Sequence, residues 1–98
     1  MTYYPTNVDS MRHGGHEFTN DAGLFLVVTH DSGGNYIIGA YADTHDDRVP
    51  AANPPAPYLP WEFDEENTVL FVTGIDTVAA YLIAIGVEPK NIPTEDAY

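Results

Sequence analysis

Apolar residues along this chain group into short runs, and the spacing within each run predicts an element. Residues 23–30 and 35–42 are both rich in β-branched and aromatic residues, as buried strands are. Asp31-Ser-Gly-Gly34 separates them, and adjacent glycines supply the positive φ angles of a tight turn. We therefore predict an antiparallel hairpin over residues 23–42, with His30 paired close to Tyr36.

The stretch 67–86 joins a third strand to the strongest helix signal in the chain. Residues 68–73 form another short β-branched and aromatic run, which Gly74 interrupts. Beyond it, apolar residues recur at intervals of three and four, the spacing of one helical face. They are Ile75, Val78, Ala79, Leu82 and Ile83. The pattern predicts a buried strand that runs directly into an amphipathic helix.

Both ends of this helix carry signals. Thr73 and Asp76 have the spacing of a capping box, and Asp76 lies in the first turn, where the helix dipole favours a carboxylate. Gly86 marks the C-terminal end, because glycine enters the left-handed conformation at little cost. Val87 then lies where a Schellman motif places its hydrophobic contact.

Apolar residues also occur where a single helix cannot cover them. The back of the helix includes Tyr81 and Ile85, which either are buried on a helix covered on most sides or form a dimer or partner surface. Both hairpin strands are apolar on both faces, and such a sheet needs a cover on each side. The helix can cover one side, and the long loop, the N-terminal segment or a second subunit must cover the other. We therefore include a homodimer among the expected states.

The remaining segments complete one expected domain, residues 1–98. An irregular segment at 1–22, with a short extended piece near residues 17–20, precedes the hairpin. An acidic, proline-rich loop at 43–66 leads to the strand–helix unit, and residues 87–98 form a tail. The expected class is α+β, with a small three-stranded, largely antiparallel sheet (the hairpin plus one strand) packed against one C-terminal helix. A small β-barrel or sandwich with an added helix is the alternative.

Charge is the outlier in the composition. Fifteen Asp and Glu residues accompany three Lys and Arg residues, for a formal net charge of −12. Such a chain repels nucleic acid and anionic membranes and attracts basic protein surfaces, so direct nucleic-acid binding is not expected. Cysteine is absent, which suits a reducing compartment. Without a signal-peptide pattern or an apolar run of membrane-spanning length, the prediction is a cytoplasmic protein.

Histidines and acids in the loops offer one candidate metal site. His13 and His16 are three residues apart, and extending the hairpin pairing brings His45 and Asp47 to the same end of the sheet. Imidazole and carboxylate are zinc ligands, so these four residues could hold a zinc-like ion. The alternative is that they are solvated loop residues.

No pattern in the chain indicates catalysis or a cofactor. Adjacent carboxylates such as Asp46 and Asp47 normally face water when they lie in loops. Serine occurs only at positions 10 and 32, without a nucleophile elbow. We expect a protein that is not an enzyme and that uses no cofactor.

Carboxylates and aromatic residues gather in the loop at 43–66, which is the candidate partner-binding region. Its residues are Asp43, Asp46, Asp47, Trp61, Glu62, Phe63, Asp64, Glu65 and Glu66. Carboxylates can imitate a phosphate backbone and steer a basic partner, while aromatic residues supply the contacts that fix a complex.

In its small size, its lack of cysteine and its excess of carboxylates, the chain resembles the phage-encoded DNA-mimic inhibitors, including anti-restriction and anti-CRISPR proteins. The resemblance is one of composition. It implies an inhibitor that occupies the nucleic-acid-binding surface of a basic protein or complex, in a host bacterial cytoplasm if the protein is phage-encoded. Two other hypotheses compete: a small oligomeric structural or interaction protein with a salt-adapted acidic surface, and a His/Asp metal-binding module.

Overall fold

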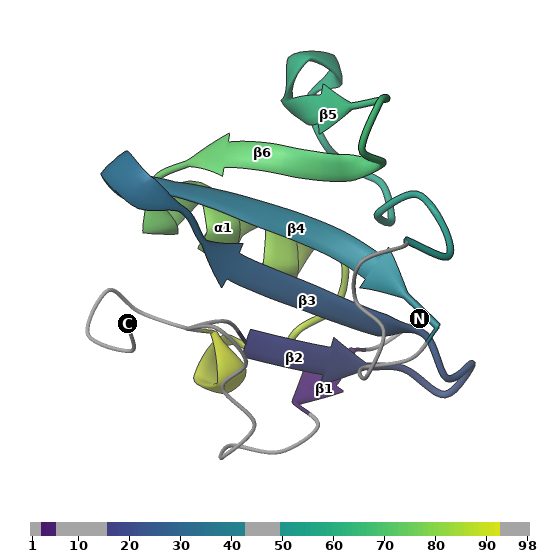
Figure 1. Cartoon of the computed structure of the whole chain (residues 1–98). Coiled ribbons are helices and arrows are strands. Elements are labelled where there is room, and N and C mark those ends of the chain that lie inside the picture. Colours follow the sequence, from purple (N-terminus) through teal and green to yellow (C-terminus); the bar gives the residue numbers. More distant parts are fainter. Residues whose placement is uncertain (1–2, 6–15, 43–49, 93–98) are drawn as a thin grey trace.

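The computed structural model describes residues 3–5, 16–42 and 50–92. Within these ranges, six strands form one antiparallel sheet in the order β1-β2-β3-β4-β6-β5 (Figure 1). The strands are β1 (Tyr4–Pro5), β2 (His16–Thr19), β3 (Phe25–His30), β4 (Asn35–Tyr41), β5 (Phe63–Asp64) and β6 (Val69–Thr73). The described helices are α1 (Ile75–Ala84) and the short 3-10 helices η1 (Ser32–Gly34), η2 (Pro60–Glu62) and η3 (Pro89–Asn91).

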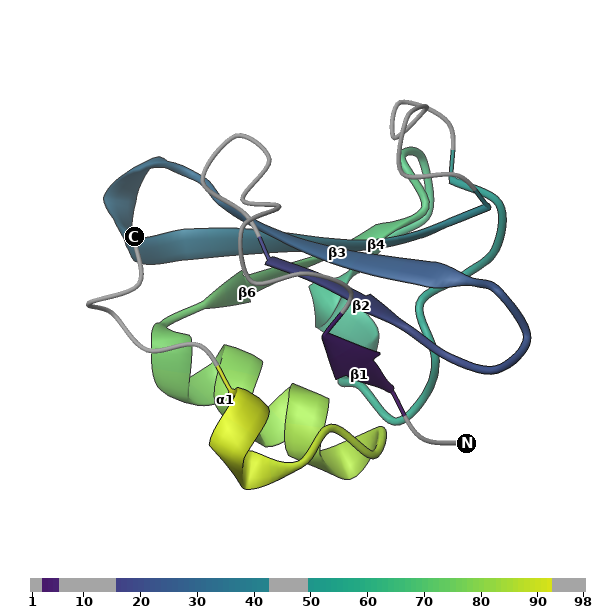
Figure 2. The ribbon, with the colours of Figure 1, turned by 90° about the horizontal axis from the view of Figure 1, so that it is seen from below.

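The hydrophobic core lies between α1 and one face of the sheet. Figure 2 shows α1 below this face and the β1 end of the sheet curling toward the helix. Phe18, Leu26, Ile38 and Leu70 are fully buried side chains of the sheet, and Leu82 is fully buried on the helix. Alternate residues of each strand supply this face, which is the period-2 pattern of a sheet with one face against a helix.

The predicted three-stranded sheet is wrong, although the α+β class agrees with the structure. The hairpin and β6 lie where they were predicted, and His30 pairs with Tyr36. Three further strands extend the sheet: β1 and β2 on the β3 side, and β5 beside β6. β1 and β5 span two residues each, which is too short for a period-2 pattern to be recognised. β2 coincides with the extended piece predicted near residues 17–20, but its place in the sheet was not predicted. The sheet is open, with β1 and β5 at its edges, so the barrel alternative is also wrong.

The C-terminal end of α1 has the predicted Schellman geometry. Gly86 has a φ of 110°, and its N–H donates to the Ile83 carbonyl at 3.1 Å. The Val87 N–H donates to the Leu82 carbonyl at 2.9 Å. Both bonds satisfy carbonyls that the end of a helix would otherwise leave without donors.

The capping box predicted for the N-terminal end of α1 is wrong. Gly74 is the N-cap, with a φ of 90°, and no side chain caps it. The Thr73 hydroxyl instead donates to Asn35 Oδ1 at 2.8 Å. Thr73 is the last residue of β6 and pairs with Asn35 of β4, so the sheet places its side chain away from the helix.

The buried face of α1 is rotated from the predicted stripe. Val78 and Leu82 are fully buried as predicted, but Ile83 is 51% exposed. Tyr81 and Ile85, which the sequence placed on the back of the helix, are each only 7% exposed and belong to the core. The helix therefore buries positions spaced i, i+3, i+4 and i+7 from Val78.

The sheet face away from α1 is also largely apolar. Val27 and Tyr41 are buried on it, while Phe71 is 42% exposed. The Tyr41 ring lies over Gly39, where an added Cβ would be 2.5 Å from the Tyr41 hydroxyl oxygen. Among the described residues, no helix or strand lies on this face (Figure 2). The helix thus covers one face as predicted, and the homodimer stays a prediction.

Candidate partner-binding surface

A proline-rich strap, residues 50–62, runs between the end of β4 and α1. It begins beside β4, where the Ala51 N–H donates to the Ala40 carbonyl at 2.9 Å. Pro54 is fully buried. Prolines have no N–H group, so such a segment can pack against the protein with few backbone partners.

Tyr81 fastens the strap to the helix. Its hydroxyl donates to the Pro55 carbonyl at 2.7 Å. Burial, and then the neighbouring Tyr3 and Tyr58, raise the pKa of the Tyr81 hydroxyl above its ordinary value. The hydroxyl therefore stays protonated and able to donate throughout the neutral range.

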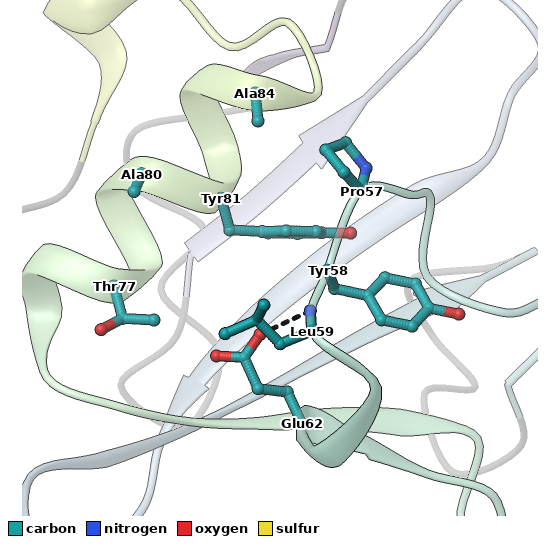
Figure 3. A pocket seen from close by; sticks show the side chains of 8 residues that line it. All are labelled: Pro57, Tyr58, Leu59, Glu62, Thr77, Ala80, Tyr81 and Ala84. Carbon is teal, nitrogen blue, oxygen red and sulfur yellow. Dashed lines mark hydrogen bonds between the residues drawn. The ribbon is translucent and has the colours of Figure 1, made fainter.

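An apolar groove with a volume of about 310 Å³ lies between the strap and α1 (Figure 3). Thr77, Ala80 and Ala84 present short side chains on successive turns of the helix, and this absence of bulk leaves the space open. Figure 3 shows the Tyr81 ring crossing from the helix toward the strap. The lining residues are Pro57, Tyr58, Leu59, Glu62, Thr77, Ala80, Tyr81 and Ala84.

The acidic turn, residues 62–66, follows the strap and includes β5. Asp64 builds this turn: its Oδ1 accepts from the N–H groups of Glu66 at 3.0 Å and Asn67 at 3.4 Å, and its Oδ2 accepts from Asn67 Nδ2 at 2.7 Å. Glu62 also bonds to the local backbone, because its Oε1 accepts from the Leu59 N–H at 3.1 Å (Figure 3). Two of the predicted partner-binding carboxylates therefore also hold the local backbone.

Among the predicted partner-binding residues that the structure describes, the exposed ones are Glu65, Glu66 and Trp61. Both glutamates are exposed, and Trp61 is 78% exposed. Phe63 differs, because it is partly buried against the core and its ring centroid lies 5.6 Å from that of Tyr58. Trp61 is therefore the aromatic side chain available to a partner, and Phe63 anchors the turn.

Among the residues that the structure describes, basic side chains are scarce. Lys90 is the single Lys or Arg within the described ranges, and its Nζ lies 3.4 Å from Glu88 Oε2. The lining of the groove includes no cation. Glu65 and Glu66 thus contribute negative charge that no described cation of the surface offsets.

The predicted metal ligands are only partly within the described ranges. His13, His45 and Asp47 lie outside them, as do the predicted partner-binding residues Asp43 and Asp46. His16 lies in β2 and pairs with Val28, so it is not at the sheet end beyond Tyr41 where the hairpin argument placed it. The chain folds back there as an additional strand, and Thr19 rather than His16 lies toward that end.

His16 is partly buried, and this burial lowers the pKa of its imidazole. Among the residues that the structure describes, no group of three or more His, Cys, Asp or Glu side chains could hold a metal ion. The metal site therefore stays a prediction.

Sequence reasoning missed the groove. Thr77, Ala80 and Ala84 are small residues on one face of the predicted helix, and this pattern is the sequence feature that could have indicated a groove. It indicates one only when the strap is known to pass beside that face. Tyr81 and Ile85, which the sequence also offered as a partner surface, are buried in the core, and Tyr81 forms one wall of the groove.

Comparison with protein-family models, curated proteins and solved structures gives no match for this chain. Within the described ranges, no helix combines the length and the apolar character that crossing a membrane requires.

Proposed function

We propose that the protein is an acidic, non-enzymatic inhibitor that acts as a DNA mimic and occupies the nucleic-acid-binding surface of a basic partner, as anti-CRISPR and anti-restriction proteins of phages do. The observation that carries the proposal is the exposure of Trp61 together with that of the carboxylates Glu65 and Glu66, four and five residues further along the chain. Tryptophan is enriched among the residues that dominate binding energy in protein interfaces. Carboxylates attract the Lys and Arg side chains with which proteins hold phosphates.

The local structure supports this proposal because it holds the charges in place. Asp64 and Glu62 bond to the backbone on either side of β5, and Phe63 is packed against the core. Side chains mounted on such a fixed turn lose less conformational entropy on binding than side chains on a mobile tail. The turn therefore presents Glu65 and Glu66 to a partner from a backbone that these hydrogen bonds hold in place.

The test compares Glu65→Lys/Glu66→Lys with the wild-type protein. The probe is a basic nucleic-acid-binding protein recovered from bacterial lysate on immobilised wild-type protein at low salt and released by high salt. The matched control is Asp21→Lys/Asp31→Lys, which makes the same change in charge at exposed positions elsewhere. We expect about tenfold or greater weakening for the first variant, equivalent to about 1.4 kcal/mol, and a smaller loss for the control. Nucleic acid should compete with the protein for the partner.

Two results would overturn the proposal: a partner that binds nucleic acid and this protein at the same time, or equal affinities for the wild type and Glu65→Lys/Glu66→Lys. Asp64 is left unchanged in this design, because its substitution would disturb the turn itself.

A second candidate is an oligomeric structural or interaction protein with a salt-adapted acidic surface. The observation that favours it is the apolar outer face of the sheet, on which Phe71 is 42% exposed. Analytical ultracentrifugation separates the two candidates. A stable dimer that Phe71→Glu converts into monomers, in a protein that retains no nucleic-acid-binding partner, would favour the second.

A further inference from the structure

We infer that the indole ring of Trp61 occupies the position of an unstacked base, so that the partner's nucleic-acid site is one that holds single-stranded or flipped-out nucleotides rather than an intact duplex. The inference rests on the proposed function, because it names the kind of nucleic acid that the same partner binds. It draws on how Trp61 is mounted, how far it is exposed and which charges follow it in the chain.

The backbone around Trp61 is tied on both sides. Trp61 is the middle residue of η2, and the φ angle of Pro60 before it is fixed by the proline ring. The Glu62 N–H donates to the Leu59 carbonyl at 3.0 Å, and the Phe63 N–H donates to the Pro60 carbonyl. Glu62 Oε1 closes the same turn by accepting from the Leu59 N–H (Figure 3). The Trp61 side chain therefore projects from a backbone that is already ordered before a partner binds.

The Trp61 ring takes no part in the core. Trp61 is 78% exposed, the highest value among the large apolar side chains that the structure describes. Tyr58 and Phe63, on either side of it in the chain, are partly buried and pack against the core. Trp61 thus offers most of its surface to a partner, and tryptophan is enriched among the residues that dominate binding energy.

The carboxylates lie within reach of the same interface. Glu65 and Glu66 follow Trp61 by four and five residues. A chain extends by at most about 3.6 Å per residue, so the Cα atoms of Trp61 and Glu66 are no more than about 18 Å apart. An interface of standard size buries about 800 Å² on each partner, a patch roughly 30 Å across. One partner surface can therefore contact the ring and both carboxylates, as it would contact a base and the phosphates near it.

Base rings and phosphates are exposed together in unstacked nucleic acid. In a duplex the rings are stacked on one another, and proteins contact the phosphates and the base edges in the grooves. Sites for unstacked bases combine a positively charged groove with aromatic or Arg side chains that stack on base faces. An indole ring can stack on those same side chains, and its contact with Arg is also a cation–π interaction. Carboxylates alone would imitate a duplex backbone, whereas the exposed ring of Trp61 adds the feature that distinguishes an unstacked strand.

Competition with defined oligonucleotides tests the kind of nucleic acid. The probe is wild-type protein with a fluorophore at its N-terminus, bound to the basic protein recovered from bacterial lysate, and displacement is followed by fluorescence anisotropy. The competitors are a single strand of about 20 nucleotides and the duplex that it forms with its complement. We expect the single strand to displace the protein at a concentration at least about tenfold lower than the duplex does. Displacement by the duplex at an equal or lower concentration would overturn the inference.

An abasic strand of the same length separates the contribution of bases from that of phosphates. It carries the same phosphates as the intact single strand but has no rings to stack. We expect it to compete at least about tenfold more weakly than the intact strand at the same ionic strength. Equal competition would show that the partner holds the backbone alone, and this result would also overturn the inference.

Substitutions at Trp61 test the ring. Trp61→Leu keeps an apolar side chain but removes the flat ring, and it should weaken binding to the partner about tenfold or more. Trp61→Phe keeps a ring that can stack and should weaken binding less. The matched control is Phe71→Leu, which makes the same kind of change at another exposed aromatic side chain and should bind as the wild type does. Circular dichroism verifies the fold of each variant. Equal affinities for Trp61→Leu and the wild type, or for Trp61→Leu and Trp61→Phe, would contradict stacking.

The two proposals fail separately. If Trp61→Leu binds as the wild type does, while Glu65→Lys/Glu66→Lys weakens the partner and nucleic acid competes, then the inference is wrong and the proposed function stands. If Trp61→Leu weakens binding but neither oligonucleotide displaces the protein, the proposed function is wrong and the inference fails with it. Trp61 is then an anchor for a partner surface of another kind.

Discussion

Asp64 and Glu65 are neighbours with the same charge, and the fold uses them differently. Asp64 is short enough to accept hydrogen bonds from backbone N–H groups two and three residues ahead, as Asp does in Asx turns. Glu65 makes no such bond in the described contacts and is exposed. Counting carboxylates in the sequence treats the two as equivalent. The distinction depends on the direction of neighbouring N–H groups, which composition does not contain.

His16 should make the free energy of unfolding depend on pH. Burial lowers its pKa below the ordinary value of 6.5, so the unfolded chain takes up this proton at a higher pH than the folded chain. The stabilising contribution is complete above pH 6.5 and declines as the pH falls toward the lower folded-state pKa. Urea unfolding at several values between about pH 8 and pH 5.5 should show a shallower decline for His16→Gln than for the wild type.

The matched control for this experiment is His30→Gln, at the end of β3, where the side chain is exposed. It should retain the decline that His16 produces. Identical pH profiles for the wild type and His16→Gln would show that His16 does not couple to folding.

At the level of elements, the sequence predicted the parts that have length and periodicity. The hairpin, β6 and the C-terminal end of α1 follow from apolar runs, adjacent glycines and Gly86. The extended piece predicted near residues 17–20 corresponds to β2, although its pairing with β3 was not predicted. β1 and β5 were not predicted, because each is two residues long and is defined by its pairing with a neighbouring strand. Pro5 even lies within β1, at the edge of the sheet, which is where a strand tolerates proline.

Helix α1 shows how tertiary context changes a correct periodicity. The intervals of three and four were right, but the strap covers the Tyr81 side of the helix through the bond to Pro55. The helix is therefore rotated so that Ile83 faces solvent. A prediction that assumes a single covering layer, the sheet, cannot include this second contact.

Paired alanine substitutions on α1 should reveal the rotation of its buried face. Leu82→Ala removes a fully buried side chain and should lower the free energy of unfolding by about 2–5 kcal/mol. Ile83→Ala alters a side chain that is 51% exposed and should lower it by less than about 1 kcal/mol. Urea titration followed by circular dichroism measures both. Similar losses for the two variants would contradict the assigned face.

On the scale of the whole molecule, the carboxylates far outnumber the basic side chains that could neutralise them. Within the described ranges, Lys90 is the single Lys or Arg, and it is beside Glu88. The remaining carboxylates repel one another, and this repulsion opposes the compact state. A surface that lowers stability in this way is consistent with a binding role for its charge, which is the proposed function.

Sodium chloride should therefore stabilise the protein. Raising its concentration from about 0.01 M to about 1 M shortens the Debye length from about 30 Å to about 3 Å, so that repulsion between exposed carboxylates is screened. We expect a gain on the order of 1 kcal/mol, or roughly 4–8 °C in Tm, measured by thermal unfolding. Glu65→Gln/Glu66→Gln should show a smaller gain.

Sucrose at matched osmolality is the control for this experiment and should not reproduce the difference between the variant and the wild type. A Tm that keeps rising well above 1 M salt would point instead to salt adaptation, because screening is already nearly complete at that concentration.

The exposure of Trp61 has a practical consequence for spectroscopy. Trp61 is the only tryptophan in the chain, and in the native state its indole is surrounded largely by water. Its emission should therefore change little when the protein unfolds, and it should shift to shorter wavelength when a bound molecule covers the ring. The protein thus carries its own fluorescent reporter, one whose emission changes little on unfolding and responds when a bound molecule covers the surface around Trp61.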